Sequence, residues 1–150
     1  MKITQAESVH ADGGYRTCSF LKLSTDEGLV GWAEYYDSFS GARIDPLIQD
    51  FARHAIGMDP RQFGRVSESL LATTRLAAGG LAQQAIAAIE NACLDIAGKA
   101  AGLPVHTLLG GPLRERVPVY WTHCGSYRVG PREPFYHGEL GYPAIRKMDD

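Results

Sequence analysis

Polar side chains that could bind a small ligand gather in three short stretches of the sequence. The candidates are Tyr15 and Arg16, then Tyr35, Tyr36, Asp37 and Ser38, and finally His123, Ser126, Tyr127 and Arg128. A guanidinium binds a carboxylate through two parallel hydrogen bonds, and hydroxyl groups both donate and accept hydrogen bonds. Such a set of groups suits a polyhydroxylated acid. The alternative is that these are ordinary polar loop residues, with a packing role for His123.

Other residues that could do chemistry form weaker patterns. His123 and Cys124 could form a nucleophilic pair, but neighbours in a strand point to opposite faces. The three cysteines, Cys18, Cys93 and Cys124, are an odd number and widely spaced, which fits neither a disulfide framework nor a zinc site. We expect them to be reduced, with Cys18 and Cys93 in the core.

Three strands that would position the first two stretches are predicted near the N-terminus. Residues 2–9, 17–24 and 29–35 carry β-branched, aromatic and aliphatic side chains with partial alternation. Asp26-Glu27-Gly28 predicts a tight turn between the second and third strands, since glycine tolerates the positive φ that a short hairpin needs. The pattern indicates an antiparallel meander.

Helical periodicity follows the strands. Apolar residues recur at spacings of three and four from Ile44 to Ala55, which predicts a first helix. Asp59-Pro60 is typical of a helix start and predicts a second helix after it. A third, alanine-rich helix is expected from Leu81 to Ala101, and Gly102 ends it. Strands followed by helices favour an α+β domain.

Composition and charge exclude several classes of function. The chain has 150 residues, of which 45% are hydrophobic and 21% charged, as in ordinary globular proteins. A net charge of −2 without a long basic block does not favour nucleic-acid binding. No run of 18 apolar residues and no apolar leader follow Met1, so we expect a cytoplasmic protein that does not bind membranes.

Two adjacent motifs near the end of the third helix resemble a known family. The run from Asp95 to Pro104 reads DIAGKAAGLP, and Leu108-Leu109-Gly110-Gly111 follows it. A strand-like segment, Arg116 to Trp121, comes next. This order resembles the passage from the N-terminal capping domain to the first barrel strand in the mandelate racemase and muconate lactonizing enzyme group of the enolase superfamily.

The resemblance implies a two-part architecture. Residues 1–112 would form an enolase-like capping domain, in which a three-stranded antiparallel meander is followed by a helical bundle. Residues 113–150 would form the first strand, at 117–122, and the following loop of an incomplete (β/α)8 barrel. A complete barrel takes roughly 250 residues, far more than follow Arg116.

The resemblance also implies a reaction. Members of the group remove a proton from the carbon next to a carboxylate, with Mg²⁺ neutralising the charge that develops. The bases and metal ligands lie on later barrel strands, so no catalytic residue and no metal ligand is assigned to this chain, and we expect the 150 residues alone to be inactive. Loops at His10 to Arg16 and Tyr35 to Gly41 would shape the substrate pocket. Residues 122–128 would follow the first barrel strand at the mouth of the barrel.

Three functions remain open from the sequence. The favoured one is the substrate-capping part of a Mg²⁺-dependent sugar-acid (aldonate or aldarate) dehydratase. In such members the first barrel strand is likewise followed by a cysteine-glycine-tyrosine-arginine type turn, which resembles residues 124–128 here. The second is a racemase or cycloisomerase of the same superfamily, and the third is a non-catalytic fragment or interaction module. The full-length enzyme is expected to bind a small carboxylate, a sugar acid, and to form a homo-oligomer.

Overall fold

The computed structural model describes residues 1–13, 16–37, 44–74 and 79–120, together with residues 134, 138, 139 and 141. It separates the chain into two compact units. The first consists of Met1–Ala11 and Thr17–Pro112, and the second of Asp12–Arg16 and Leu113–Asp150. The prediction of separate domains on either side of residue 112 stays a prediction.

The predicted meander is confirmed. Strands β1 (Ile3–Asp12), β2 (Thr17–Thr25) and β3 (Val30–Tyr35) form an antiparallel sheet in the order β1-β2-β3. Gly28 has a φ of 82° in the turn between β2 and β3, as its position predicts. Strand β1 runs to Asp12, beyond the expected end at residue 9.

The three predicted helices are confirmed as α1 (Asp45–Ala55), α2 (Phe63–Thr73) and α3 (Gly80–Ala101). Before α2 lies a short 3-10 turn, η1 (Pro60–Gln62), which is capped by Asp59. A further one-turn helix, α4 (Val105–Leu108), was not predicted. Four residues are too few to show an apolar periodicity.

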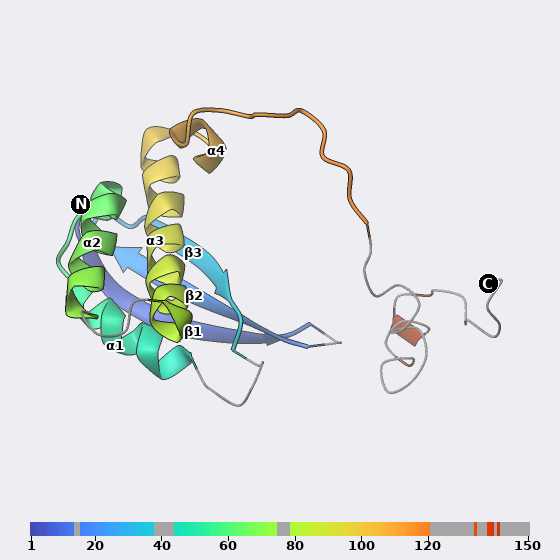
Figure 1. The fold of residues 1–150 in the computed structure, drawn as a ribbon, viewed down its shortest axis with the longest axis horizontal. Coiled ribbons are helices and arrows are strands. Elements are labelled where there is room, and N and C mark those ends of the chain that lie inside the picture. The colour runs from blue at the N-terminus through green and yellow to red at the C-terminus, as the bar shows by residue number, and fades with distance from the viewer. Residues whose placement is uncertain are drawn as a thin grey trace. The chain divides into compact units, whose positions relative to one another are not determined.

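The helices cover one face of the sheet (Figure 1). Alternate residues of β2 and β3 are buried, which is the pattern of a sheet with one covered face. Helix α3 packs on both strands, and α1 and α2 pack on α3. The largest fully buried side chains of this core are Ile3, Leu21, Leu23, Ile44, Ile48, Val66, Leu70, Ile86, Ile89, Cys93 and Ile96.

Helix α3 and strand β3 approach each other closely at Gly31. A Cβ atom at this position would lie 2.1 Å from the backbone oxygen of Ala92 and 2.6 Å from Cγ1 of Ile96. Only glycine fits such a separation without a shift of the backbone.

Side chains of α3 also cover the free edge of the sheet beside Gly31. The backbone N–H of Trp32 donates to Asp95 Oδ2 at 2.9 Å, and Lys99 Nζ donates to the carbonyl oxygen of Val30 at 2.7 Å. Lys99 and Asp95 also bind each other at 2.7 Å. These groups satisfy edge positions that would otherwise be open to another strand.

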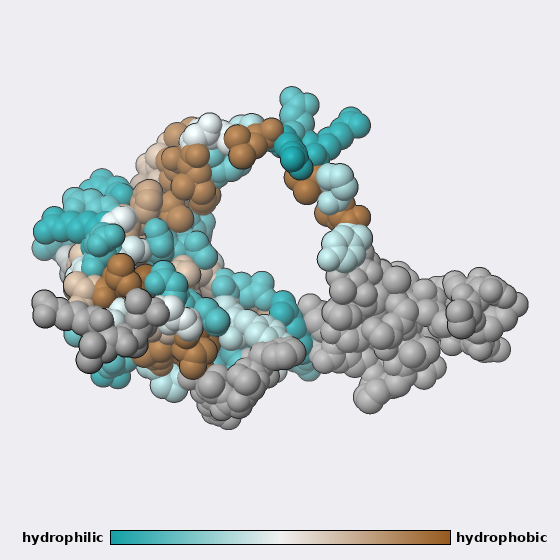
Figure 2. All heavy atoms as spheres, viewed as in Figure 1, coloured by the Kyte–Doolittle hydropathy of each residue, from teal (hydrophilic) through white to brown (hydrophobic). Residues whose placement is uncertain are grey.

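Helix α3 ends at Gly102, as the sequence predicts. Gly102 has a φ of 65°, and the N–H of Leu103 donates to the carbonyl of Gly98 at 2.9 Å, which is the Schellman arrangement. Apolar residues lie over the end of α3 and over α4 (Figure 2), where Leu103 is 45% and Leu109 66% exposed.

The predicted strand at 117–122 is not formed in the described residues of the second unit. Residues 117–120 have no regular structure, and Val117, Val119 and Tyr120 are 68%, 90% and 86% exposed. Residues 121 and 122 lie outside the described part of the chain. The sequence alternates as a strand does, but a strand also needs a hydrogen-bonded neighbour, and the sheet of the structure comprises only β1, β2 and β3 among the described residues.

Candidate functional site

Polar side chains from three elements meet at the C-terminal end of β3. The hydroxyl of Tyr35 donates to Asp45 Oδ1 at 2.7 Å, and the hydroxyl of Ser8 donates to the same carboxylate oxygen. Gln49 Nε2 donates to Ser8 Oγ at 2.6 Å. Helix α1 is therefore joined to β1 and to β3 by hydrogen bonds through one carboxylate.

Asp37 serves the start of helix α1. Its Oδ1 accepts the backbone N–H groups of Ile44 at 2.8 Å and of Asp45 at 3.4 Å. The first N–H groups of a helix have no partner within the helix, and a carboxylate there is favoured by both hydrogen bonding and the helix dipole. Asp37 thus acts as a cap although it lies outside the helix.

His10 also contacts Tyr35. Its Nδ1 lies 3.1 Å from Ser19 Oγ, and its ring meets the Tyr35 ring edge to face, with centroids 6.5 Å apart. His10 therefore has partners on β2 and β3, in the part of β1 that the sequence predicts as loop.

The surroundings of Tyr35 keep its phenol protonated. Its side chain is only 7% exposed. Burial raises the pKa of Tyr35; the hydrogen bond with Ser8 opposes this, whereas the hydrogen bond to Asp45 and the charges of Asp45 and Asp37 add to it. Tyr35 is therefore a hydrogen-bond donor throughout the neutral pH range.

A hollow of about 190 Å³ lies beside this cluster. It is lined by Glu34, Tyr35, Tyr36, Ile44, Gln84, Ala87, Ala88 and Asn91. Among these described residues Glu34 is charged and none is a cation, while Tyr36, Gln84 and Asn91 can both donate and accept hydrogen bonds. The described part of the lining therefore offers hydrogen-bonding groups that suit the hydroxyl groups of a ligand.

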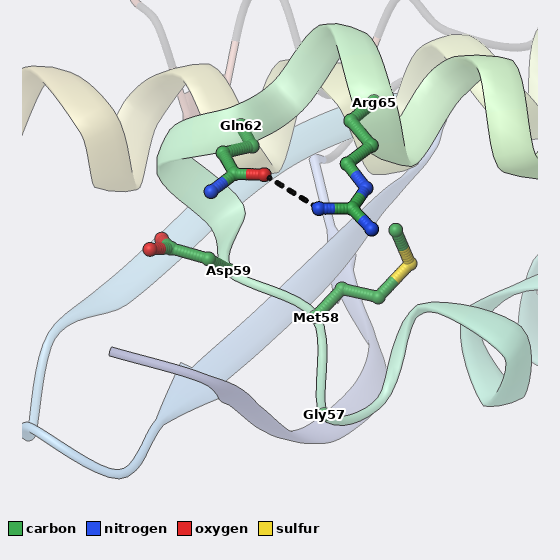
Figure 3. Close-up of a pocket in the computed structure, with 5 residues that line it drawn as sticks. All are labelled: Gly57, Met58, Asp59, Gln62 and Arg65. Atoms are coloured by element: carbon green, nitrogen blue, oxygen red, sulfur yellow. Dashed lines mark hydrogen bonds between the residues drawn. The ribbon is translucent and has the colours of Figure 1, made fainter.

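A second hollow of about 240 Å³ is lined by the loop after α1, by η1 and by the start of α2, and its described lining contains none of the predicted site residues. Figure 3 shows Gln62 and Arg65 joined by a hydrogen bond of 3.3 Å, with Asp59 pointing away from them. Asp59 instead pairs with the Arg61 side chain, and this pairing holds the pKa of the Asp59 carboxyl at about 2. Asp59 also accepts the backbone N–H of Arg61 at 3.0 Å. These contacts describe the start of a helix, so we regard this hollow as structural.

The structure brings together three of the predicted site residues, Tyr35, Tyr36 and Asp37. Tyr36 is 43% exposed, whereas Tyr35 is buried and Asp37 is half-buried. Arg16 belongs to the second unit, where its carbonyl accepts the N–H of Gly13 at 2.9 Å. The remaining candidates lie outside the described residues: Tyr15, Ser38, His123, Ser126, Tyr127 and Arg128.

Sequence reasoning missed the partners of Tyr35. Ser8 and Asp45 are 37 residues apart and share no local motif. Asp45-Pro46 resembles an ordinary helix start, and the structure adds the two hydroxyl partners.

For the described part of the chain, no group of three or more His, Cys, Asp or Glu side chains is placed to hold a metal ion. No described helix has the length and apolar character needed to cross a membrane.

Sequence comparison identifies relatives among curated proteins. A family profile described as the mandelate racemase / muconate lactonizing enzyme N-terminal domain matches residues 8–110. D-galactonate dehydratase from Xanthomonas axonopodis pv. citri is 35% identical over 131 residues, which are 87% of this chain and 33% of that protein. D-galactonate dehydratase from Variovorax paradoxus is 37% identical over 101 residues, 67% of this chain and 26% of that protein. The chain thus spans about a third or less of the length of these relatives.

Solved structures share the fold. A candidate L-alanine-DL-glutamate epimerase from Burkholderia xenovorans, bound to magnesium and fumarate, superimposes with a TM-score of 0.82 at 37% identity, over 88% of this chain and 33% of that one. A candidate galactarate dehydratase from Agrobacterium radiobacter, bound to sodium and L-malate, gives a TM-score of 0.72 at 32% identity, over 80% and 30% of the two chains.

The meander with helices on one face is the fold of the capping domain in the enolase superfamily. Together with the matching profile and relatives, it shows that this chain belongs to the mandelate racemase / muconate lactonizing enzyme family. The family resemblance seen in the sequence is confirmed.

Proposed function

We propose that this chain is the N-terminal, substrate-capping part of a sugar-acid dehydratase that removes the proton next to a carboxylate. The observation that carries the proposal is the 35% identity to a D-galactonate dehydratase over 87% of the chain. Two structural relatives bound to the small acids fumarate and L-malate lend further support.

In the proposed enzyme, the described residues of this chain recognise hydroxyl groups of the substrate. The hollow beside Tyr36 offers hydroxyl, carboxamide and carboxylate groups, which match the alternating donors and acceptors of a sugar chain. The described residues of its lining include no cation to pair with the carboxylate end. That end would be bound elsewhere, by Arg16, by Arg128 or by groups of the remaining enzyme.

Magnesium belongs to the proposal for the full-length enzyme. The ion would neutralise charge on the substrate carboxylate during proton removal. The family resemblance places the metal ligands and the bases on later barrel strands, so our proposal assigns neither to this chain. The inactivity expected of the 150 residues alone, the homo-oligomer and the cytoplasmic location stay predictions.

An epimerase, racemase or cycloisomerase is the second candidate function. The candidate epimerase from Burkholderia xenovorans favours it, because that structure superimposes with the higher TM-score of the two described above. The residues that would separate a dehydratase from a racemase are the acid-base groups, to which this chain contributes none in our proposal. A non-catalytic interaction module is the third possibility that the sequence leaves open.

The test is an assay of the full-length enzyme that contains this segment. We expect D-galactonate or another aldonate or aldarate to lose water and yield a 2-keto-3-deoxy acid, in a reaction that requires Mg²⁺ and stops with a chelator. Inversion of a stereocentre without loss of water would favour the racemase or epimerase function instead. Binding of sugar acids without turnover in the presence of Mg²⁺ would contradict both.

A further inference from the structure

The carboxylate of Asp45 connects helix α1 to both outer strands of the sheet. Its Oδ1 accepts hydrogen bonds from Ser8 on β1 and from Tyr35 on β3. Gln49, one turn further along α1, donates to Ser8 and so reinforces the same contact. Loss of this carboxylate would leave two hydroxyl groups without their acceptor, one of them on a side chain that is only 7% exposed.

A second set of hydrogen bonds joins Asp37 to the start of α1. Asp37 precedes α1 in the sequence and accepts the N–H groups of Ile44 and Asp45, while Asp45 accepts the hydroxyl of Tyr35. The residues on both sides of Tyr36 are therefore bound to the start of α1. Tyr36 itself has a side chain that is 43% exposed and lines the hollow of about 190 Å³.

This arrangement fixes the backbone of Tyr36 and leaves its side chain accessible. A binding group held in place before the ligand arrives loses less conformational entropy on binding. We propose that Asp45 is a positioning residue for substrate recognition, which holds Tyr35 and, together with Asp37, presents Tyr36 to a hydroxyl group of the sugar acid. The proposal rests on the proposed function and extends it to a residue that does not itself line the hollow.

The experiment is a double-mutant cycle between Asp45 and Tyr36 in the full-length enzyme. Asp45→Ala and Tyr36→Phe are each expected to raise KM for the sugar acid about tenfold, with kcat changed less than about threefold. Because Asp45 acts through Tyr36, the double variant should have the KM of Tyr36→Phe and not an increase of about a hundredfold. Multiplicative effects of the two changes would overturn the proposal.

Three further variants separate positioning from folding. Asp45→Asn keeps the size of the side chain and an acceptor oxygen, so its KM should lie between that of the parent enzyme and that of Asp45→Ala. Tyr35→Phe removes the donor and should reproduce Asp45→Ala in a milder form. Asp50→Ala is the matched control, because Asp50 is an exposed carboxylate of the same helix that pairs with Arg53 at 3.3 Å, and its KM should equal that of the parent enzyme.

A second measurement does not depend on catalysis. In Asp45→Ala, amide exchange over residues 44–52 should be at least about fivefold faster than in the Asp50→Ala control, because the start of α1 loses its anchor. Unchanged exchange would overturn the role of Asp45 whatever the kinetics show. Faster exchange in an enzyme that turns over no sugar acid would overturn the proposed function and the substrate role of Tyr36, while the structural contact itself would stand.

Discussion

The two ends of strand β3 are held to the helices by different kinds of interaction. At the Gly31 end, the strand lies so close to α3 that no side chain fits, and Asp95 and Lys99 cover the sheet edge. At the other end, the Tyr35 hydroxyl donates to Asp45, and Asp37, two residues after the strand, accepts the N–H of Ile44, so that the end of the strand is joined to α1. Close packing, with two hydrogen bonds at the sheet edge, therefore fixes one end, and a polar network fixes the other.

The two ends of β3 therefore serve different purposes: the Gly31 end belongs to the packed core, and the Tyr35 end belongs to the candidate site. Close packing tolerates almost no change of volume, which suits the part of the domain that must stay rigid. A polar network defines the positions of individual donors and acceptors, which suits a site for a hydroxylated ligand. Substitutions at the two ends should therefore have unequal effects on stability.

The largest effect is expected at Gly31. Gly31→Ala places a Cβ within 2.1 Å of the Ala92 oxygen, so strand and helix must separate, at a cost of about 3 kcal/mol in the free energy of unfolding. Denaturant unfolding of the first unit measures this cost.

Gly64→Ala is the matched control for that prediction. Gly64 is an exposed helical residue with no atom within 4 Å of an added Cβ. Alanine should stabilise the helix there by about 0.5–1 kcal/mol. Equal effects of the two substitutions would contradict the close approach of α3 and β3.

A smaller effect is expected at the sheet edge. Asp95→Ala removes the acceptor of the Trp32 N–H and the partner of Lys99, and should cost about 1–2 kcal/mol because the group lost is charged and only partly exposed. Asp50→Ala, which removes an exposed ion pair, should stay within about 0.5 kcal/mol of the parent. A faster amide exchange of Trp32 in Asp95→Ala alone would locate the effect at the edge.

The smallest expected effect is a loss of stability at alkaline pH. Burial raises the pKa of the Cys93 thiol to about 12, and it also raises the pKa of Tyr35. Both groups stay protonated in the folded state while they ionise in the unfolded state. The stability that they contribute is complete below the unfolded pKa values, roughly 8.5 for Cys and 10 for Tyr, and is lost as the pH rises toward the folded values.

Two variants assign this alkaline loss to its residues. From pH 7 to pH 9, the parent should lose somewhat less than about 1 kcal/mol, nearly all of it through Cys93. Cys93→Ala should remove the loss in this interval, and Tyr35→Phe should alter the pH dependence only above about pH 10. A parent whose stability rises between pH 7 and pH 9 would contradict the burial of the thiol.

Most of the fold could be predicted because its elements have a strong local pattern. Leu21, Leu23 and Ala33 alternate as strand residues do, and Ile86, Ile89 and Cys93 repeat as on a helix face. The extension of β1 to Asp12 could not be predicted, since residues 10–12 lack the local strand pattern and the contacts of His10 with Ser19 and Tyr35 are made across the sheet. The barrel strand expected at 117–122 stays a prediction: residues 117–120 have no regular structure here, because alternation alone does not provide a paired neighbour.

The candidate site was predicted only in part. The sequence indicates Tyr35, Tyr36 and Asp37 by their chemistry and by family resemblance, and the structure places them together. It could not indicate that Ser8 and Asp45 hold Tyr35, because that contact depends on how α1 docks on the sheet. Whether these residues bind substrate stays a prediction.

The Schellman end of α3 has a consequence for gene fusion. Among the described residues, every buried apolar side chain of the first unit precedes Gly98, and the chain turns away at Gly102 and Leu103. A recombination point placed between Leu109 and Pro112 would therefore leave this hydrophobic core intact. A capping segment transplanted at that point onto the barrel of another family member should keep its cooperative unfolding transition, and loss of that transition would show that residues beyond this point are needed to fold it.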